Sequence, residues 1–191
     1  APLIAPAEGL TIRIEGELIS RPYVDMTVRM MRDFGAMVQE LGGAFVVLPG
    51  TYRAKNAYRV EADASGASYF LALGALTGGP VTVTGVGEGS MQGDVAFADA
   101  LALMGAQVEK TAEAITVSRD PSVRLKGIDL DCTRIPDAAM TFVPMALMTD
   151  SPVRLTGIAS WRVKETDRLA AMACEMRKFG ASVEEGPDYI V

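Results

Sequence analysis

The feature that most limits how this chain can fold is a short motif that occurs three times. A Phe or Met, a Gly, an Ala, a variable residue and a Val follow one another at 34–38, 104–108 and 179–183. Each copy comes after a stretch in which apolar residues recur every three or four positions, and before a strand-like stretch. The glycine suits the position just past a helix C-terminus, where the backbone turns left-handed. The chain is therefore predicted to consist of similar units in series.

A second repeated element precedes two of the predicted helices. Val81–Gly85 and Val153–Gly157 both alternate apolar and polar residues. This alternation is typical of β-strands. Two more helices are expected at Ser65–Thr77 and Pro136–Met148, the second of them kinked or shortened by Pro144.

The predicted unit has the order strand, helix, strand, helix, strand, strand. Tyr58–Val117 is expected to be one full copy that begins with a strand. Gly127–Val191 is a second copy, cut off in its last strand at Tyr189–Val191, and residues 1–55 hold the second half of an earlier copy. We expect an α/β (α+β) chain that is an internal piece of a longer protein.

Composition places the chain among soluble globular proteins. Hydrophobic residues make up 49% and charged residues 22% of its 191 residues. The sequence has no apolar run that could cross a bilayer and no signal-peptide pattern, so no membrane partner is expected and the predicted location is cytoplasmic. A net charge of −6 argues against nucleic-acid binding, although a local group of Lys and Arg can still attract small anions.

The absence of histidine excludes several kinds of chemistry. Ser-His-Asp and Cys-His nucleophile systems, histidine zinc sites and histidine general bases are all ruled out. Cys132 and Cys174 lack the spacing of metal ligands and are expected to be buried thiols. Acid–base chemistry would have to use carboxylates, lysine or tyrosine, and no metal site is predicted.

One segment combines two cations with a carboxylate. Ser160–Leu169 is predicted to open a helix, which would place Lys164 and Arg168 one turn apart on one face, with Glu165 beside them. A helix N-terminus also favours anions. The alternative is a solvated, ion-paired first turn, and the pattern by itself favours that alternative.

Two further helix beginnings carry polar residues. Asp137 lies in the predicted first turn of one, either as a general base or as a carboxylate that stabilises the helix start by about 0.3–1 kcal/mol. Ser20, Arg21 and Tyr23 lead into another helix and could all donate to a phosphate. The alternative there is an ordinary N-cap and turn.

These segments together resemble one enzyme family, the 5-enolpyruvylshikimate-3-phosphate (EPSP) synthases. The matching stretches follow the family's order along the whole chain, at 16–27, 63–71, 90–94, 135–141 and 161–169. Lys-Glu-Thr-Asp-Arg-Leu at 164–169 is specific to this family. The resemblance implies βαβαββ units in two domains of three, each an inside-out α/β barrel. Residues 1–62 would end one domain, and 63–191 would supply two units of the other, the last one truncated.

The resemblance also implies an activity. Family members transfer an enolpyruvyl group from phosphoenolpyruvate to the 5-hydroxyl of shikimate 3-phosphate and release phosphate, a step of chorismate and aromatic amino acid biosynthesis. They use neither a metal nor an organic cofactor. The expected partners are these two small anions and the remaining half of the same enzyme.

The family's site residues can be carried over to matching positions. Asp137 resembles the base toward the 5-hydroxyl, and Glu165 resembles the proton donor and acceptor at the methylene carbon. Lys164 resembles a residue that contacts the shikimate hydroxyls and shares in proton transfer. Arg168 resembles a clamp for phosphoenolpyruvate, because its planar head group suits carboxylate or phosphate.

Three more positions are implied to bind shikimate 3-phosphate. Ser20 resembles a ligand of its phosphate, with Tyr23 close by, and Ser160 stands where the family commonly has an asparagine. Several cation-bearing segments of the family lie outside this chain, so the chain alone is expected to be inactive. Two alternatives stay open: a related enolpyruvyl transferase that acts on a UDP-sugar, and a non-catalytic binding module built from the same repeat.

Overall fold

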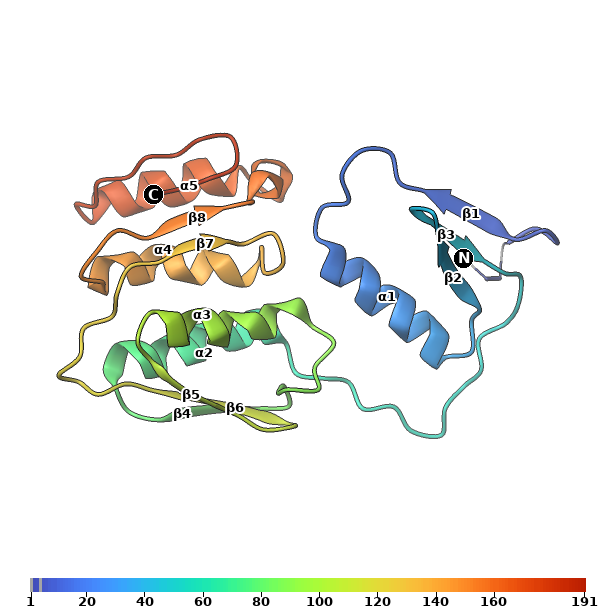
Figure 1. Ribbon diagram of the computed structural model, residues 1–191, viewed down its shortest axis with the longest axis horizontal. Coiled ribbons are helices and arrows are strands. Elements are labelled where there is room, and N and C mark those ends of the chain that lie inside the picture. Colours follow the sequence, from blue (N-terminus) through green and yellow to red (C-terminus); the bar gives the residue numbers. More distant parts are fainter. Residues whose placement is uncertain (1, 4) are drawn as a thin grey trace. The chain divides into compact units, whose positions relative to one another are not determined.

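The computed structural model describes residues 2–3 and 5–191 (Figure 1). The chain divides into two compact units, Ala1–Val60 and Glu61–Val191. The boundary expected from the sequence falls two residues later, after residue 62. The assignment of the two units to separate three-unit domains of a longer protein stays a prediction.

The first unit is one helix on a three-stranded antiparallel sheet of order β1-β3-β2 (Figure 1). Val24, Val28 and Met31 recur at helical spacing and pack against a small core that includes Phe45 and Val47. The elements are β1 (Leu10–Arg13), α1 (Arg21–Asp33), β2 (Val38–Leu41) and β3 (Ala44–Val47).

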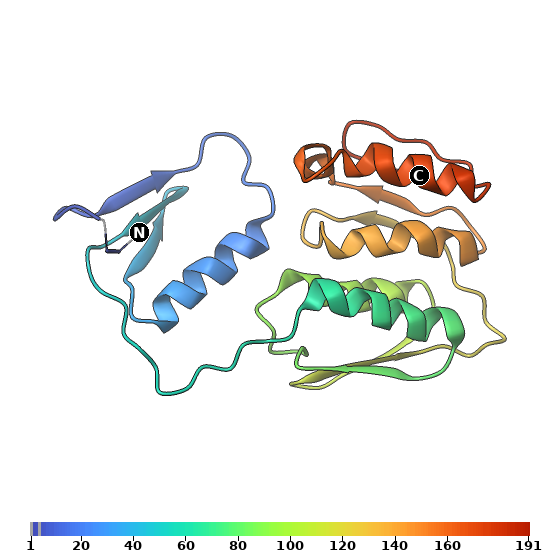
Figure 2. The same cartoon turned by 180° about the vertical axis from the view of Figure 1, so that it is seen from behind.

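The second unit begins with a first repeat, residues 61–118. Its two helices lie on one face of a three-stranded antiparallel sheet of order β4-β6-β5, as both views show (Figures 1 and 2). Asp63 caps the first helix by accepting from the Ser65 N–H at 3.0 Å, and Gly78 ends it at φ 86°. The elements are α2 (Ala64–Thr77), β4 (Val81–Thr84), the 3₁₀ helix η1 (Gly93–Ala96), α3 (Phe97–Leu103), β5 (Gln107–Lys110) and β6 (Ala114–Ser118).

A second repeat, residues 129–191, follows in the same unit. Its two strands are parallel, with Leu130 opposite Leu155. Phe142 from this repeat stacks on Phe97 from the first, with ring centroids 4.4 Å apart, so that the two repeats share one core. The elements are β7 (Asp129–Asp131), η2 (Ala138–Thr141), α4 (Phe142–Met145), η3 (Ala146–Met148), β8 (Arg154–Thr156), η4 (Ala159–Val163) and α5 (Arg168–Lys178).

Several expectations about these elements are confirmed. A helix covers 64–77, and strands occupy 81–84 and 154–156. The helix expected at Pro136–Met148 is broken into three short pieces around Pro144, because proline lacks the N–H that would continue the helical ladder. Within the described residues, no helix is both long enough and apolar enough to span a membrane.

Three expectations are wrong. The strand at the start of Tyr58–Val117 does not form: residues 58–62 have no strand assignment, although the Ala62 N–H donates to the Gly85 carbonyl at 3.0 Å. The last strand, at 189–191, is reduced to isolated bridges of Ile190. A strand needs a continuous ladder with a neighbour, and both segments have only isolated contacts. Cys174 is exposed, whereas Cys132 is buried as expected.

Candidate active site

Two parallel strands bring the charged residues of the second unit together. Asp137 lies in the segment that follows β7, and Ser160, Lys164, Glu165 and Arg168 lie in the segment that follows β8. Because β7 and β8 are parallel neighbours, the segments after their carboxyl ends leave from the same edge. The topology therefore places the two segments side by side.

Trp161 joins these segments next to the charged residues. Its side chain is fully buried, and its indole N–H donates to the Pro136 carbonyl at 2.6 Å. Pro136 directly precedes Asp137. This role of Trp161 was not predicted from the sequence, although a single tryptophan beside a group of charges is a signal that could have indicated it.

Arg168 is the centre of the charged group. Its Nη1 donates to Asp137 Oδ1 at 2.7 Å, and its Nε and Nη2 donate to the two carboxylate oxygens of Glu165, each at 2.8 Å. Lys164 Nζ lies 3.7 Å from the same Asp137 oxygen. The Arg168 side chain is only 15% exposed, whereas that of Glu165 is 63% exposed. Two cations and two carboxylates thus form one connected cluster.

The hydrogen bonds of this cluster set the charge of Glu165. Those from Arg168 lower the pKa of Glu165, and the nearby negative charge of Asp137 opposes this only weakly. The pKa of Arg168 is raised, mainly by its hydrogen bonds to Glu165. In this arrangement Glu165 is therefore ionised at neutral pH, and Arg168 is a cation hydrogen-bonded to two carboxylates.

The predicted reason for the closeness of Lys164 and Arg168 is wrong. Helix α5 begins only at Arg168, and Lys164 has an extended backbone at φ −83° and ψ −152°. The helix start is capped by Asp167, which accepts from the Ala170 N–H at 3.0 Å. The two cations meet because both reach Asp137, and not because they share a helix face.

The structure does not show Asp137 capping the start of a helix. Asp137 precedes η2, a helix of one 3₁₀ turn, and its side chain makes no capping hydrogen bond there. The carboxylate instead faces Arg168 and Lys164 across the gap between the two segments. Its position thus favours a role within the cluster over a role in stabilising the helix.

Arg162 holds the segment between η4 and α5 in place. Its Nη1 donates to both carboxylate oxygens of Asp167, at 3.0 and 2.8 Å, and its Nη2 donates to the Gly186 carbonyl at 2.6 Å. Glu185 adds an ion pair at 3.1 Å. These contacts fix the ends of the short stretch that carries Lys164 and Glu165, a role of Arg162 that was not predicted from the sequence.

Ser160 has an unsatisfied hydroxyl. Its Oγ is buried and, within the part of the chain that the structure describes, has no hydrogen-bond partner. It lies on η4, directly before Trp161. A buried hydroxyl without a partner is costly, so the Ser160 hydroxyl is available to a ligand group.

Ser20 and Tyr23 belong to the first unit. Among the described residues, Ser20 is the only non-glycine residue with a positive φ, at 57°. It occupies the N-cap position of α1, but its side chain makes no capping hydrogen bond there. A strained backbone of this kind is common at binding sites. Arg21 is engaged with Asp25 and Glu40, each at 2.7 Å.

Comparison with known proteins identifies the family. The model of the family EPSP synthase (3-phosphoshikimate 1-carboxyvinyltransferase) matches residues 1–191. The chain belongs to the EPSP synthase family. A 3-phosphoshikimate 1-carboxyvinyltransferase of Laribacter hongkongensis is 55% identical over an alignment of 186 residues that covers 96% of this chain and 44% of the relative. The enzyme of that name from Paraburkholderia phytofirmans is 51% identical over an alignment of 195 positions that covers 100% of this chain and 45% of the relative.

Solved structures show the same fold. An EPSP synthase from Acinetobacter baumannii has a TM-score of 0.71 and 28% identity, with 96% of this chain and 43% of that chain covered. The enolpyruvyl transferase NikO from Streptomyces tendae has a TM-score of 0.68 and 16% identity, with 99% of this chain and 43% of that chain covered. At this identity the likeness shows the fold alone. The expected α/β class is confirmed. The chain spans less than half the length of these EPSP synthase relatives.

Proposed function

We propose that the protein containing this chain is a 3-phosphoshikimate 1-carboxyvinyltransferase. It would transfer the enolpyruvyl group of phosphoenolpyruvate to the 5-hydroxyl of shikimate 3-phosphate. The single observation that carries the proposal is the cluster of Asp137, Lys164, Glu165 and Arg168 at adjacent segments, in a chain of this family. Relatives more than half identical to this chain have that name.

The cluster suits the binding of small anions. Arg168 presents a planar group of donors, which matches carboxylate and phosphate oxygens, and Lys164 adds a second positive charge close by. An incoming anion would compete with Glu165 for Arg168. Exchange of one anionic partner for another keeps the arginine charge compensated while the substrate binds.

This exchange would allow Glu165 to become protonated and act as an acid. While Arg168 holds it, Glu165 is ionised and has no proton to donate. Loss of the arginine partner to a substrate anion removes the main cause of its lowered pKa. Glu165 can then take up a proton and pass it to the methylene carbon of phosphoenolpyruvate.

The reaction proceeds by addition followed by elimination. In the first step the 5-hydroxyl oxygen bonds to C2 of phosphoenolpyruvate, Asp137 accepts the hydroxyl proton, and the methylene carbon gains a proton from Glu165. In the second step the C2–O bond to phosphate breaks, the new methyl group returns a proton to Glu165, and the leaving phosphate takes up the proton that Asp137 accepted. The products are the enolpyruvyl ether and phosphate. Lys164, 3.7 Å from Asp137, is placed to share in the transfer.

The other assigned residues would hold shikimate 3-phosphate. The unsatisfied Ser160 hydroxyl would donate to it in place of the longer asparagine side chain of the family. Ser20 has a left-handed backbone, and its side chain makes no capping hydrogen bond to α1. It would bind the phosphate near Tyr23. The rest of the same protein would supply further cations, so the chain alone would be inactive, and the cytoplasm would be its location.

A chimeric enzyme tests this proposal. The matching segment of the Laribacter hongkongensis relative would be replaced by this chain, and phosphate release from phosphoenolpyruvate would be measured with and without shikimate 3-phosphate. We expect turnover that requires both substrates. Asp137→Asn should lower the rate by about 10²–10⁴, the usual contribution of a general base. The matched control is Asp129→Asn, since Asp129 is an exposed aspartate on β7.

Two results would contradict the proposal. A folded chimera that does not release phosphate would remove the assigned activity, and an Asp137→Asn rate within about tenfold of the parent, roughly 1.4 kcal/mol, would remove the assigned base. Turnover of a UDP-sugar instead would favour the alternative transferase. Turnover by the isolated chain would overturn the expectation that it is incomplete.

A further inference from the structure

The buried polar side chains of the second unit gather in one place. Within residues 2–3 and 5–191, the polar or charged residues that are buried are Ser68, Asp94 and Thr141, which are 0%, 5% and 5% exposed. They lie on three elements, α2, η1 and η2, and α2 packs against both of the others. Burial of a polar side chain is unfavourable unless it is hydrogen-bonded, so their common location indicates that they form a network.

A directed chain of hydrogen bonds connects these residues. The Ser68 hydroxyl donates to the Ser65 carbonyl at 2.6 Å, and the Ser65 hydroxyl donates to the Asp94 carboxylate. The hydroxyl oxygens of Thr141 and Ser68 are 2.7 Å apart. A hydroxyl has one proton, and that of Ser68 is already used, so the Thr141 hydroxyl is the donor in this pair. The chain of hydrogen bonds thus runs from η2 through α2 to η1.

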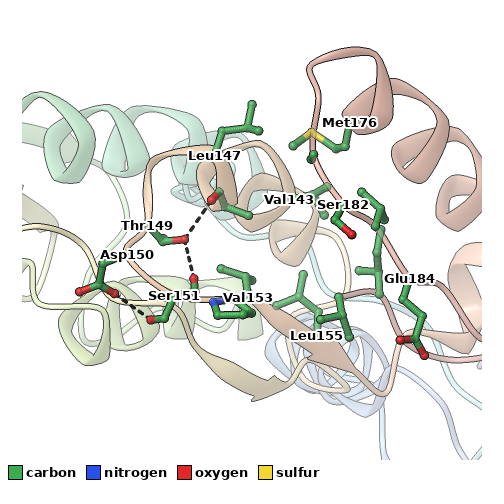
Figure 3. A pocket seen from close by; sticks show the side chains of 16 residues that line it. Val143, Leu147, Thr149, Asp150, Ser151, Val153, Leu155, Met176, Ser182 and Glu184 are labelled. Atoms are coloured by element: carbon green, nitrogen blue, oxygen red, sulfur yellow. Dashed lines mark hydrogen bonds between the residues drawn. The ribbon is translucent and has the colours of Figure 1, made fainter.

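The network lies apart from the open pocket of the second repeat. That pocket has a volume of about 530 Å³, and its lining includes Val143, Leu155 and Met176 (Figure 3). Neither Thr141 nor Ser68 is part of the lining. The hydroxyl pair therefore joins two elements inside the core and does not face a ligand in this pocket.

The hydrogen bond between Thr141 and Ser68 crosses the junction of the two repeats. Thr141 belongs to the second repeat and Ser68 to the first. Phe142, the next residue, stacks on Phe97 across the same junction. Apolar packing has no direction, whereas a hydrogen bond requires a narrow range of distance and angle. The hydroxyl pair therefore fixes the position of η2 on α2.

Helix η2 carries the candidate base. Asp137 directly precedes its single turn, and Thr141 is the last residue of that turn. Before Asp137, the Pro136 carbonyl accepts from the Trp161 indole N–H at 2.6 Å. After Asp137, the hydrogen bond from Thr141 to Ser68 holds the end of the turn. The backbone that carries the Asp137 carboxylate is thus held on both sides by buried groups.

We propose that Thr141 and Ser68 are positioning residues for the transfer reaction. Their hydrogen bond would hold η2 where the Asp137 carboxylate meets the acceptor hydroxyl, while neither side chain contacts a substrate. This inference rests on the proposed function, in which Asp137 is the base. A shift of a reacting group by about 1 Å can lower a rate by roughly 100-fold. Loss of the hydrogen bond should therefore lower the catalytic rate more than it weakens substrate binding.

The chimeric enzyme that tests the proposed function also tests this inference. Thr141→Val removes the hydroxyl and keeps the branched shape, and we expect kcat to fall about 10- to 100-fold with KM for both substrates within about twofold. Thr141→Ser keeps the donor and should retain kcat within about threefold. Ser68→Ala removes the acceptor of the same bond, so it should reproduce the loss independently of the valine variant.

A double variant shows whether Thr141 acts through Asp137. In a chimera that already carries Asp137→Asn, Thr141→Val should change kcat by less than about twofold, because the effects of residues that act as a unit are not additive. The matched control is Thr82→Val, since Thr82 forms a similar hydroxyl pair of 2.8 Å with Thr116 at an exposed place on the sheet of the first repeat. This control should leave kcat within about twofold of the parent chimera.

Four results would overturn the inference. Equal losses from Thr141→Val with and without Asp137→Asn would show that Thr141 does not act through the carboxylate. A Thr141→Ser variant as slow as Thr141→Val would assign the loss to packing. A Thr141→Val rate equal to that of the Thr82→Val control, with Asp137→Asn still slow, would remove the positioning role and leave the proposed function intact. An Asp137→Asn chimera as fast as the parent would remove the proposed base, and this inference with it.

Discussion

Replacement of Trp161 by phenylalanine should loosen the link between the two segments of the cluster. The change removes the 2.6 Å hydrogen bond to the buried Pro136 carbonyl. A buried carbonyl left without its donor costs about 1–3 kcal/mol. The smaller ring leaves a cavity that costs roughly 1–2 kcal/mol more. The expected loss is about 2–5 kcal/mol of unfolding free energy, or a fall of about 5–15 °C in the thermal midpoint for a chain of this size.

The assay is thermal and urea unfolding of the 191-residue chain followed by far-UV circular dichroism, which does not depend on tryptophan fluorescence. Tyr69→Phe is the control, because Tyr69 is 66% exposed and its change should stay within about 0.5 kcal/mol. A Trp161→Phe loss below about 1 kcal/mol, or one equal to that of the control, would refute the reasoning that this hydrogen bond joins the segments.

Three further predictions concern individual side chains. Arg168 lowers the pKa of Glu165, so their pairing stabilises the fold above the ordinary value of 4.5 and is lost as the pH falls through the lowered value. Glu165→Gln should therefore lower the thermal midpoint near neutral pH and lower it less as the pH falls below 4.5, and a pH-independent effect would contradict this. Gly157→Ala should destabilise the chain by about 2 kcal/mol or more in urea unfolding, since its φ is +70° and a Cβ would lie 2.4 Å from a threonine hydroxyl; a neutral result would contradict that geometry. Burial raises the pKa of the Cys132 thiol to about 12, so a thiol reagent at pH 8 should modify Cys174 rapidly and Cys132 only after unfolding; two fast thiols would disprove the burial.

The sequence predicted much of the local structure, because local signals determine it. Alternation identified β4 and β8, and the proline inside 136–148 indicated a broken helix. The family was also predicted correctly, because the Lys-Glu-Thr-Asp-Arg-Leu stretch is a specific motif. The composition of the charged group was likewise visible in the sequence.

The arrangement of the candidate site could not be predicted from the same signals. It depends on the parallel pairing of β7 with β8, a contact between residues far apart in the sequence. Helical spacing suggested a shared face for Lys164 and Arg168, whereas Asp137 from the other segment brings them together. The left-handed backbone of Ser20 was also missed, because serine carries no preference for that conformation.

A crystal structure of the chimeric enzyme with both substrates would test the central claim most directly. The account predicts phosphoenolpyruvate oxygens on Arg168, a Glu165 no longer paired with both arginine donors, and the 5-hydroxyl within about 2.6–3.2 Å of Asp137. Substrates bound elsewhere, with the hydrogen bonds from Arg168 to Asp137 and Glu165 unchanged, would contradict it.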